Sequence, residues 1–156
     1  MTSAHPDFAD VDASSLDDAG LLKLLRGELA EPVKVLNGEL LDIDSERGIC
    51  RFRFVIVPAF CHSRGQICQG GFLTGMVDTA MANAAIAKGK LAVAVPTLEL
   101  KISFFEAVGP GPVIAEGRVM RWGGSVGFLD GDIKDEKGRL IVHATSTIKI
   151  VRPKKQ

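Results

Sequence analysis

The sequence has no excess of either charge and no apolar run long enough to cross a membrane. Its 156 residues include 19 Lys and Arg and 19 Asp and Glu, so it presents no net basic field that would attract nucleic acid. The apolar run FVIVPAF at residues 54–60 is far shorter than the roughly 20 residues that a membrane-spanning helix needs. We therefore expect neither a nucleic-acid partner nor a membrane helix.

Cysteine is scarce, and the beginning of the chain does not look like an export signal. The three cysteines cannot all pair within one chain. The opening residues MTSAHPDFAD have no basic region followed by an apolar run, so we expect no secretory signal. These features predict reduced thiols and a cytoplasmic location.

A tail and a short helix are predicted ahead of the main domain. Residues 1–14 have the character of a loose tail. Ser15 predicts an N-cap because apolar residues at helical spacing follow it, and Pro32 would end that helix. With 46% hydrophobic and 24% charged residues, the composition is typical of a soluble globular protein. We expect residues 1–30 to form the tail and helix and residues 31–152 to form one domain.

Beyond the first helix the apolar pattern changes to a period of two, which is the period of a β-strand. The clearest case is ICRFRFVIV at 49–57, where Phe52 and Phe54 fall on one face and Arg51 and Arg53 on the other. The other strand-like runs are residues 33–43, 97–105, 112–122, 125–135 and 139–151. Consecutive strands without helices between them predict an antiparallel sheet of the α+β class.

A second helix is predicted within this pattern by GQICQGGFLTGMVDTAMAN at 65–83. It runs from about Gly70 to Ala87, and Gly89 lies near its C-cap position. Apolar residues cover most of its circumference, which predicts a helix buried by its surroundings, as when a curved sheet wraps round it. Asp78 is the exception, since Asp is a mediocre helix former and burying its charge is costly unless it is paired or hydrogen-bonded.

Two features of this central helix can carry chemistry. Gly70 and Gly71 stand at its start, where N–H groups lack intrahelical partners and glycine lets a ligand approach closely. A substrate carbonyl held there would be polarised, although a glycine pair also suits a tight turn. Asp78 could act as a general base on water or as a nucleophile. The structural alternative is a carboxylate that accepts hydrogen bonds from hydroxyls, for which the candidates are Thr74, Thr79, Thr97 and Ser103.

Cys61, His62 and Cys68 form a second cluster of reactive side chains. Their spacing does not match a zinc site, and the distant His143 lies on a predicted strand, so we expect no metal. Cys68 could be a thiol nucleophile just before the helix, with His62 as its base. We rank a Cys68 nucleophile below Asp78 as the group that carries the chemistry.

The stretch 65-GQICQGGFLTGMVDTAMA-82, with the strand layout around it, resembles the hotdog-fold acyl-CoA thioesterases of the phenylacetate-pathway (PaaI-like) branch. The resemblance covers about residues 30–152. The matching positions are Gly65, Gly70, Gly71, Asp78 and, on the downstream strand, Thr97. Gln69 takes the place of the family's histidine and Ser63 that of its loop asparagine, and both substitutes can hydrogen-bond.

The resemblance implies a hotdog fold, in which a curved antiparallel sheet of about five to six strands wraps round one central helix. It implies hydrolysis of an acyl-CoA thioester to free CoA and a carboxylic acid, with CoA as part of the substrate and no other cofactor. The implied catalytic residues are Asp78, Gly70, Gln69, Ser63 and Thr97, and the substrate-binding residues are Gly71, Arg64, Phe72 and Met81. The implied assembly is a homodimer or homotetramer, in which Ser63, Gln69 and Gly70 of one chain face Asp78 and Thr97 of its partner.

Two other functions stay open from the sequence. Gln69 and Ser63, in place of the family's residues, favour a non-catalytic acyl-CoA-binding module. A hotdog hydratase or dehydratase would want an Asp–His pair, and no histidine lies near Asp78 in the sequence. Aryl and medium-chain acyl groups both remain open, because the apolar helix residues do not define the width or depth of a pocket.

Overall fold

The computed structural model describes residues 13–152 of the chain. Its N-terminal helices are α1 (Asp18–Gly27) and α2 (Glu31–Val35), and 3-10 turns occupy Ala13–Ser15 and Pro58–Phe60. The strands are β1 (Gly38–Asp44), β2 (Ile49–Ile56), β3 (Cys61–His62), β4 (Ile67–Cys68), β5 (Thr97–Phe104), β6 (Gly111–Trp122), β7 (Val126–Asp135) and β8 (Leu140–Lys149). The long helix α3 (Gly70–Lys88) follows β4. No helix in the described part of the chain is long and apolar enough to cross a membrane.

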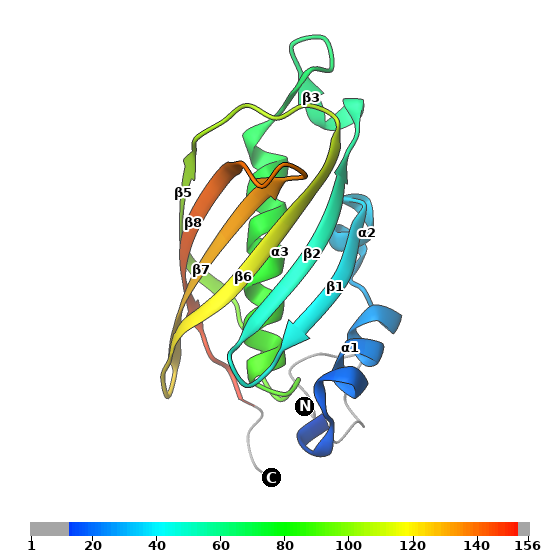
Figure 1. Cartoon of the computed structure of the whole chain (residues 1–156). Coiled ribbons are helices and arrows are strands. Elements are labelled where there is room, and N and C mark those ends of the chain that lie inside the picture. Colours follow the sequence, from blue (N-terminus) through cyan, green and yellow to red (C-terminus); the bar gives the residue numbers. More distant parts are fainter. Residues whose placement is uncertain (1–12, 153–156) are drawn as a thin grey trace.

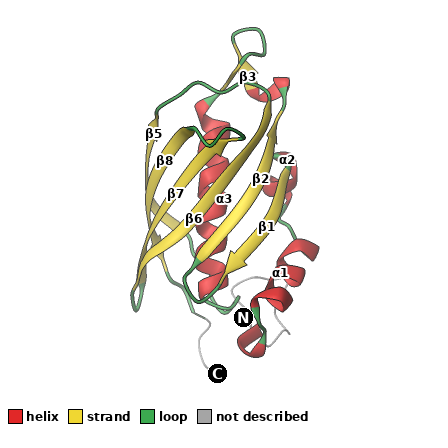
Figure 2. Ribbon diagram, viewed as in Figure 1, coloured by secondary structure: helices red, strands yellow, loops and turns green. Residues whose placement is uncertain are grey.

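The main sheet is antiparallel, with the strand order β1-β2-β6-β7-β8-β5, and it curves round α3 (Figure 1). The strands β3 and β4 form a separate hairpin near the start of α3 (Figure 2). The element order and the single wrapped helix confirm the predicted α+β architecture. The predicted central helix is confirmed too, and Gly89 is its C-cap residue.

A pair of glycines sets how closely α3 packs on the sheet. Gly117 on β6 and Gly131 on β7 are directly opposite each other in the sheet register. A Cβ atom added to Gly117 would lie 2.4 Å from the backbone of Ala80, and one added to Gly131 would lie 2.8 Å from side-chain atoms of Val77 and Met81. The middle of the helix therefore rests on a strip of sheet that has no side chains, as close packing of the core requires.

The side of α3 that faces the sheet is fully buried, whereas the opposite side is only half-buried. Met76, Val77 and Ala80 on the sheet side are 0% exposed. The half-buried positions include Thr74, Gly75, Asp78, Thr79, Ala82 and Asn83. The predicted burial of this helix by the sheet is confirmed on the sheet side, and the described residues leave the opposite side partly open.

The N-terminal region departs from the sequence prediction in two places. Asp17, not Ser15, caps α1, and its carboxylate accepts a hydrogen bond from a backbone N–H of the first turn at 2.8 Å. Pro32 does not end a helix but lies in the first turn of α2, where the missing N–H of proline has no helical partner to lose. The strand predicted from residue 33 consequently starts at Gly38.

Helix α1 belongs to the same hydrophobic core as the sheet. Leu21 and Leu25 are buried in that core. Lys90, just after α3, donates a hydrogen bond from Nζ to the Leu16 carbonyl at 2.9 Å and so ties the two regions together. Residues 1–12 of the predicted tail lie outside the described residues, and the division of the chain near residue 30 stays a prediction.

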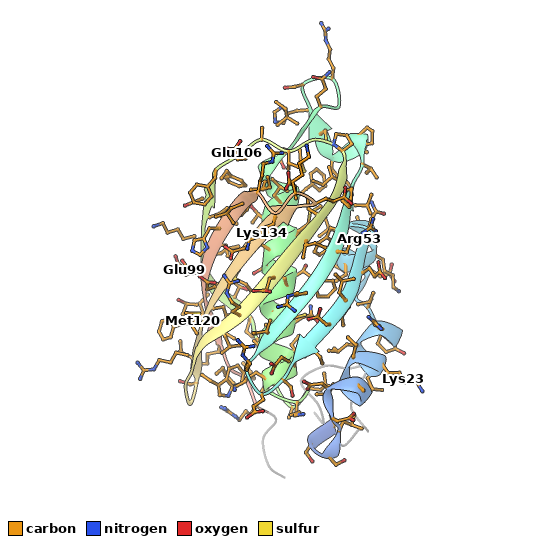
Figure 3. All side chains as sticks on the ribbon, viewed as in Figure 1. Lys23, Arg53, Glu99, Glu106, Met120 and Lys134 are labelled. Carbon is orange, nitrogen blue, oxygen red and sulfur yellow. The ribbon has the colours of Figure 1, made fainter. Side chains whose placement is uncertain are left out.

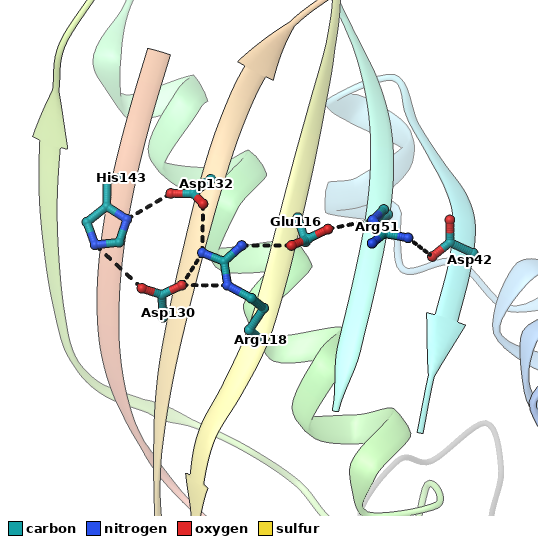
Figure 4. Close-up of polar contacts among 7 residues, drawn as sticks. All are labelled: Asp42, Arg51, Glu116, Arg118, Asp130, Asp132 and His143. Atoms are coloured by element: carbon teal, nitrogen blue, oxygen red, sulfur yellow. Dashed lines mark hydrogen bonds and ion pairs between the residues drawn. The ribbon is translucent and has the colours of Figure 1, made fainter. Parts of the chain in front are cut away.

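The outer face of the sheet carries charged side chains that point away from α3, among them Arg53 (Figure 3). Ion pairs run across the middle of this face from β1 to β8 (Figure 4). The members of this outer-face network are Asp42, Arg51, Glu116, Arg118, Asp130, Asp132 and His143. Arg118 is central, with nitrogen atoms 2.7 Å from carboxylate oxygens of both Glu116 and Asp132.

Candidate active site

The start of α3 offers one open backbone donor. Gln69 is the N-cap residue, and its side-chain Oε1 accepts a hydrogen bond from the Gly71 N–H at 2.7 Å. Among residues 13–152 the Gly70 N–H has no hydrogen-bond acceptor. Helix-start N–H groups lie at the positive end of the helix dipole. The donor available to a bound carbonyl is therefore that of Gly70, while Gly71 serves the cap.

The loop before the helix is a tight hairpin with an exposed tip. Ser63, Arg64 and Gly65 all have positive φ angles, of 51°, 59° and 79°. The Ser63 hydroxyl oxygen lies 2.8 Å from His62 Nδ1. Because Ser63 and Arg64 are both exposed, these two predicted site residues are open to a substrate or to a second chain.

Asp78 lies on the half-buried side of α3, and Thr97 is its one hydrogen-bond partner among the described residues. Thr97 Oγ1, on β5, donates to Asp78 Oδ1 at 3.2 Å. Of the other candidates, Thr74 and Thr79 donate to backbone carbonyls one turn earlier in the helix, and Ser103 lies on the outer face of the sheet.

The surroundings of Asp78 make its carboxylate more basic than that of a surface Asp. Burial raises the pKa of Asp78, and the hydrogen bond from Thr97 offsets part of that rise. A carboxylate that is poorly solvated and has only a neutral partner can accept a proton from water more readily than a fully solvated one.

Phe104 is a site residue that the sequence analysis did not single out. Its ring lies over the start of α3, since a Cβ atom added to Gly70 would be 2.9 Å from Phe104 Cζ. The side chain is 52% exposed and forms one wall of a groove of about 360 Å³ beside Gly70. The rest of the lining is mostly apolar, with Glu106 as its acidic member. The sequence feature that could have pointed to Phe104 is the Phe104-Phe105 pair, which ends the alternating strand and precedes a loop.

Two predicted substrate-binding residues have packing roles in this chain. Phe72 stacks on Phe60, with ring centroids 4.5 Å apart and planes inclined by 19°. Met81 is 0% exposed and packs against Gly131 in the core. Met81 consequently does not line the groove, and the structure gives it the place of a core residue.

Gly70 and Asp78 cannot serve the same substrate atom within one chain. They lie a little over two helical turns apart on α3, which at about 1.5 Å per residue is about 12 Å along the axis. A general base must reach the proton that it removes within about 3 Å, directly or through one water. The chain therefore has two separate candidate half-sites, an electrophilic one at the helix start and a basic one in the middle of the helix.

One group of possible metal ligands exists among residues 13–152, and it belongs to the outer-face network, on the side of the sheet that faces away from α3. Ligating atoms of Asp130, Asp132 and His143 lie within 4.8 Å of one another. Arg118 contacts both carboxylates, and His143 Nδ1 lies 2.8 Å from Asp132 Oδ1. Because the Arg118 guanidinium already pairs with both carboxylates, we assign the group to the ion-pair network.

A curved sheet round one helix, with a glycine pair at the start of the helix and a carboxylate in its middle, defines a hotdog-fold protein. A family model described as "Thioesterase superfamily" matches residues 65–142, half of the chain. The chain belongs to the thioesterase superfamily, and its resemblance to the PaaI-like branch is confirmed by solved structures.

Two of these structures come from proteins of phenylacetic acid degradation. A phenylacetic acid degradation-related protein from Ralstonia eutropha JMP134 is 30% identical with a TM-score of 0.74, over 81% of this chain and 96% of that one. The PaaI protein of E. coli is 19% identical with a TM-score of 0.76, over 86% and 94% of the two chains, and it supports the fold. A Saccharolobus solfataricus protein named "putative esterase" is 34% identical over 93 residues, which is 60% of this chain but only 66% of that relative's length.

Proposed function

We propose that this protein hydrolyses an acyl-CoA thioester to free CoA and a carboxylic acid. The observation that carries the proposal is an open Gly70 N–H at the start of the same helix that holds Asp78 with a raised pKa. The first supplies a donor for a developing oxyanion, and the second supplies a base for water. The superfamily membership and the names of the relatives support the same reaction.

In the proposed reaction the thioester carbonyl oxygen accepts the Gly70 N–H, and the acyl group enters the groove beside Phe104. The Asp78 carboxylate of a second chain removes a proton from water, whose oxygen attacks the carbonyl carbon. The tetrahedral oxyanion forms against the Gly70 N–H, and its collapse breaks the C–S bond and releases the CoA thiolate, which takes up a proton. We prefer this route to direct attack by Asp78, because the hydroxyls of Thr97 and Ser63 can hold the water.

The reaction needs two copies of the chain, because each copy carries two separated half-sites. Two features support a two-fold homodimer: one side of α3 is only half-buried, and β5 is an edge strand on which Leu98 is 59% exposed. An isologous contact along these elements brings the start of one helix towards Asp78 of the other chain. Two such dimers would give a homotetramer. We place this assembly in the cytoplasm, with no cofactor other than the CoA of the substrate.

The first test is thiol release from a panel of aryl-, short- and medium-chain acyl-CoAs. Hydrolysis above the uncatalysed rate would support the proposal and begin to define the acyl group. Release from none of them by a folded oligomer that still binds acyl-CoA would contradict it. That result would favour the binding-module alternative, to which the replacement of the family's histidine and asparagine by Gln69 and Ser63 also points.

A second test asks whether the site combines two chains. Gly70→Pro deletes the donor and keeps the helix start, because proline is tolerated at the first helical position and Gln69, with φ −70° and ψ 133°, already has the backbone that precedes proline. The added Cβ also displaces the Phe104 ring, so Gly70→Ala, which adds the same Cβ but keeps the N–H, is the matched control. We expect Gly70→Pro to lose about 10²–10³-fold in turnover. Refolded together with Asp78→Asn, it should form hybrid dimers with one intact site each and recover up to about a quarter of the wild-type rate. Absence of recovery in a mixture shown to contain hybrids would place the site within one chain.

A further inference from the structure

The hairpin that leads into α3 places two cysteines directly opposite each other. Cys61 on β3 and Cys68 on β4 are register partners. Cys68 donates its N–H to the Val108 carbonyl at 2.8 Å, and the next N–H, that of Gln69, donates to the Phe60 carbonyl at 2.9 Å. This pattern marks Cys61 and Cys68 as a non-hydrogen-bonded pair, the narrow kind with a Cα–Cα distance of about 4.5 Å. That distance falls within the range of about 4.4–6.8 Å that disulfides span.

The two thiols differ in access. Cys61 is partly exposed and Cys68 is buried. Their weak hydrogen bonds go to backbone carbonyls, from Cys61 to Val57 at 3.6 Å and from Cys68 to Gln69 at 3.7 Å. Burial raises the pKa of Cys68 to about 11, and the neighbouring Cys61 thiol adds to the rise. The partly exposed Cys61 is therefore the thiol that an external reagent meets first.

We propose that Cys61 and Cys68 are a reversible redox pair, and that exchange with a small-molecule disulfide links them and closes the loop of residues 61–68. The Cys61 thiolate attacks one sulfur of the reagent, releases one small thiol and forms a mixed disulfide. The Cys68 thiolate then attacks the Cys61 sulfur and displaces the second small thiol. The two cysteine protons pass to the two released thiols, and the two electrons lost by the cysteines reduce the reagent.

The pair lies at the entrance of the candidate active site. The loop that the disulfide would close carries Ser63 and Arg64, and Cys68 is followed at once by Gln69 and Gly70. Cys68 also lines the groove beside the helix start. The regulatory meaning of this position rests on the proposed function, but the cross-link itself does not. It can therefore be tested without any measurement of hydrolysis.

The experiment treats the folded full-length chain with oxidised glutathione at about pH 8, where thiolates begin to form. After the remaining thiols are blocked, trypsin digestion and mass spectrometry follow without reduction. Arg64 lies between the two cysteines, so trypsin places Cys61 on peptide 54–64 and Cys68 on peptide 65–88. We expect these peptides to be joined, at a mass lower by two hydrogen atoms than their sum, and to separate on treatment with dithiothreitol.

The chain offers matched controls. Cys50 is 0% exposed on β2, so Cys50→Ser should give the joined peptides as wild type does. Cys61→Ser and Cys68→Ser should give none. The oxidised wild type should also have a higher urea midpoint than the reduced protein, because the cross-link restricts the unfolded chain. Persistent glutathione adducts without joined peptides, a link to Cys50, or a lowered urea midpoint would each overturn the proposal.

Discussion

Asp78 and Asp132 are both partly buried, yet their pKa values move in opposite directions. Burial raises the pKa of Asp78, and the Thr97 hydroxyl offsets only part of that rise. For Asp132 burial also acts upward, but hydrogen bonds from His143 and Arg118 hold the pKa below that of an ordinary Asp. Burial acts upward on both carboxylates, and only Asp132 has charged or hydrogen-bonding partners strong enough to reverse the direction of the shift.

This contrast separates a carboxylate held in structural ion pairs from the one that we propose to be catalytic. A partly buried acid that is matched by a guanidinium stabilises the fold at neutral pH, whereas an acid paired only with a neutral hydroxyl costs stability when it ionises. Asp132 belongs to ion pairs that connect neighbouring strands. Asp78 forms no ion pair among the described residues that would offset the cost of burying its charge. An uncompensated, partly buried carboxylate is the pattern expected of a functional group.

The largest difference should appear in turnover. We expect Asp78→Asn to lower the rate of acyl-CoA hydrolysis by at least about a hundredfold, the scale of lost general-base catalysis. The matched variant Asp132→Asn should keep a rate close to that of wild type, because its carboxylate is on the outer face of the sheet. Thiol release at saturating substrate measures both. A near-normal rate for Asp78→Asn, or an equal loss of rate in the two variants, would contradict the proposal that Asp78 is catalytic and Asp132 structural.

The outer-face network should show its role in stability. Arg118→Met leaves Glu116, Asp130 and Asp132 facing one another without a shared cation. We expect a loss of about 1–3 kcal/mol in the free energy of unfolding, less than for a fully buried pair because the Arg118 side chain is 27% exposed. Arg53→Met is the matched control, since Arg53 lies on the same face without an ion pair among the described residues. Urea unfolding compares the two, and equal losses would contradict the proposed importance of the network.

The stability of the two Asp→Asn variants should depend on pH with opposite signs. The lowered pKa of Asp132 contributes stability at neutral pH that is lost as the pH falls through its folded-state value, so Asp132→Asn should be less stable than wild type at pH 7. The raised pKa of Asp78 costs stability above its folded-state value, so Asp78→Asn should be more stable at pH 7. Both differences should shrink below the ordinary Asp pKa of about 3.9. Urea midpoints at neutral and acidic pH measure them, and differences of the same sign would contradict the comparison.

The strands and the central helix could be predicted from the sequence because each follows from local periodicity. Residues 49–57 alternate without interruption, and the helix is bounded by Gly70 at its start and Gly89 after its end. Pro32 was misjudged because proline both ends helices and begins them, and only the packing of α2 decides between the two.

The outer-face network and the Phe104 groove could not be read in the same way. Arg51, Glu116 and Asp132 become cross-strand neighbours only through the strand order and register of the folded sheet. Phe104 reaches Gly70 through the path of an edge strand that is remote in sequence. The division of the site between two chains was expected only from the family resemblance, and the separation of Gly70 and Asp78 along α3 gives it a geometric reason.

The smallest effect should come from the single partner of Asp78. Thr97→Val deletes the hydroxyl that donates to the carboxylate at 3.2 Å, so the pKa of Asp78 should rise further. Because the general base must be ionised, the acid limb of kcat/KM should move to higher pH. The rate at neutral pH should fall by up to about tenfold, since the same hydroxyl is proposed to help hold the attacking water and one hydrogen bond contributes about 0.5–1.5 kcal/mol. Thr97→Ser keeps the donor and should leave the limb in place. A profile of kcat/KM against pH for the three proteins decides the matter: an unmoved limb in Thr97→Val would mean that burial alone sets the basicity of Asp78.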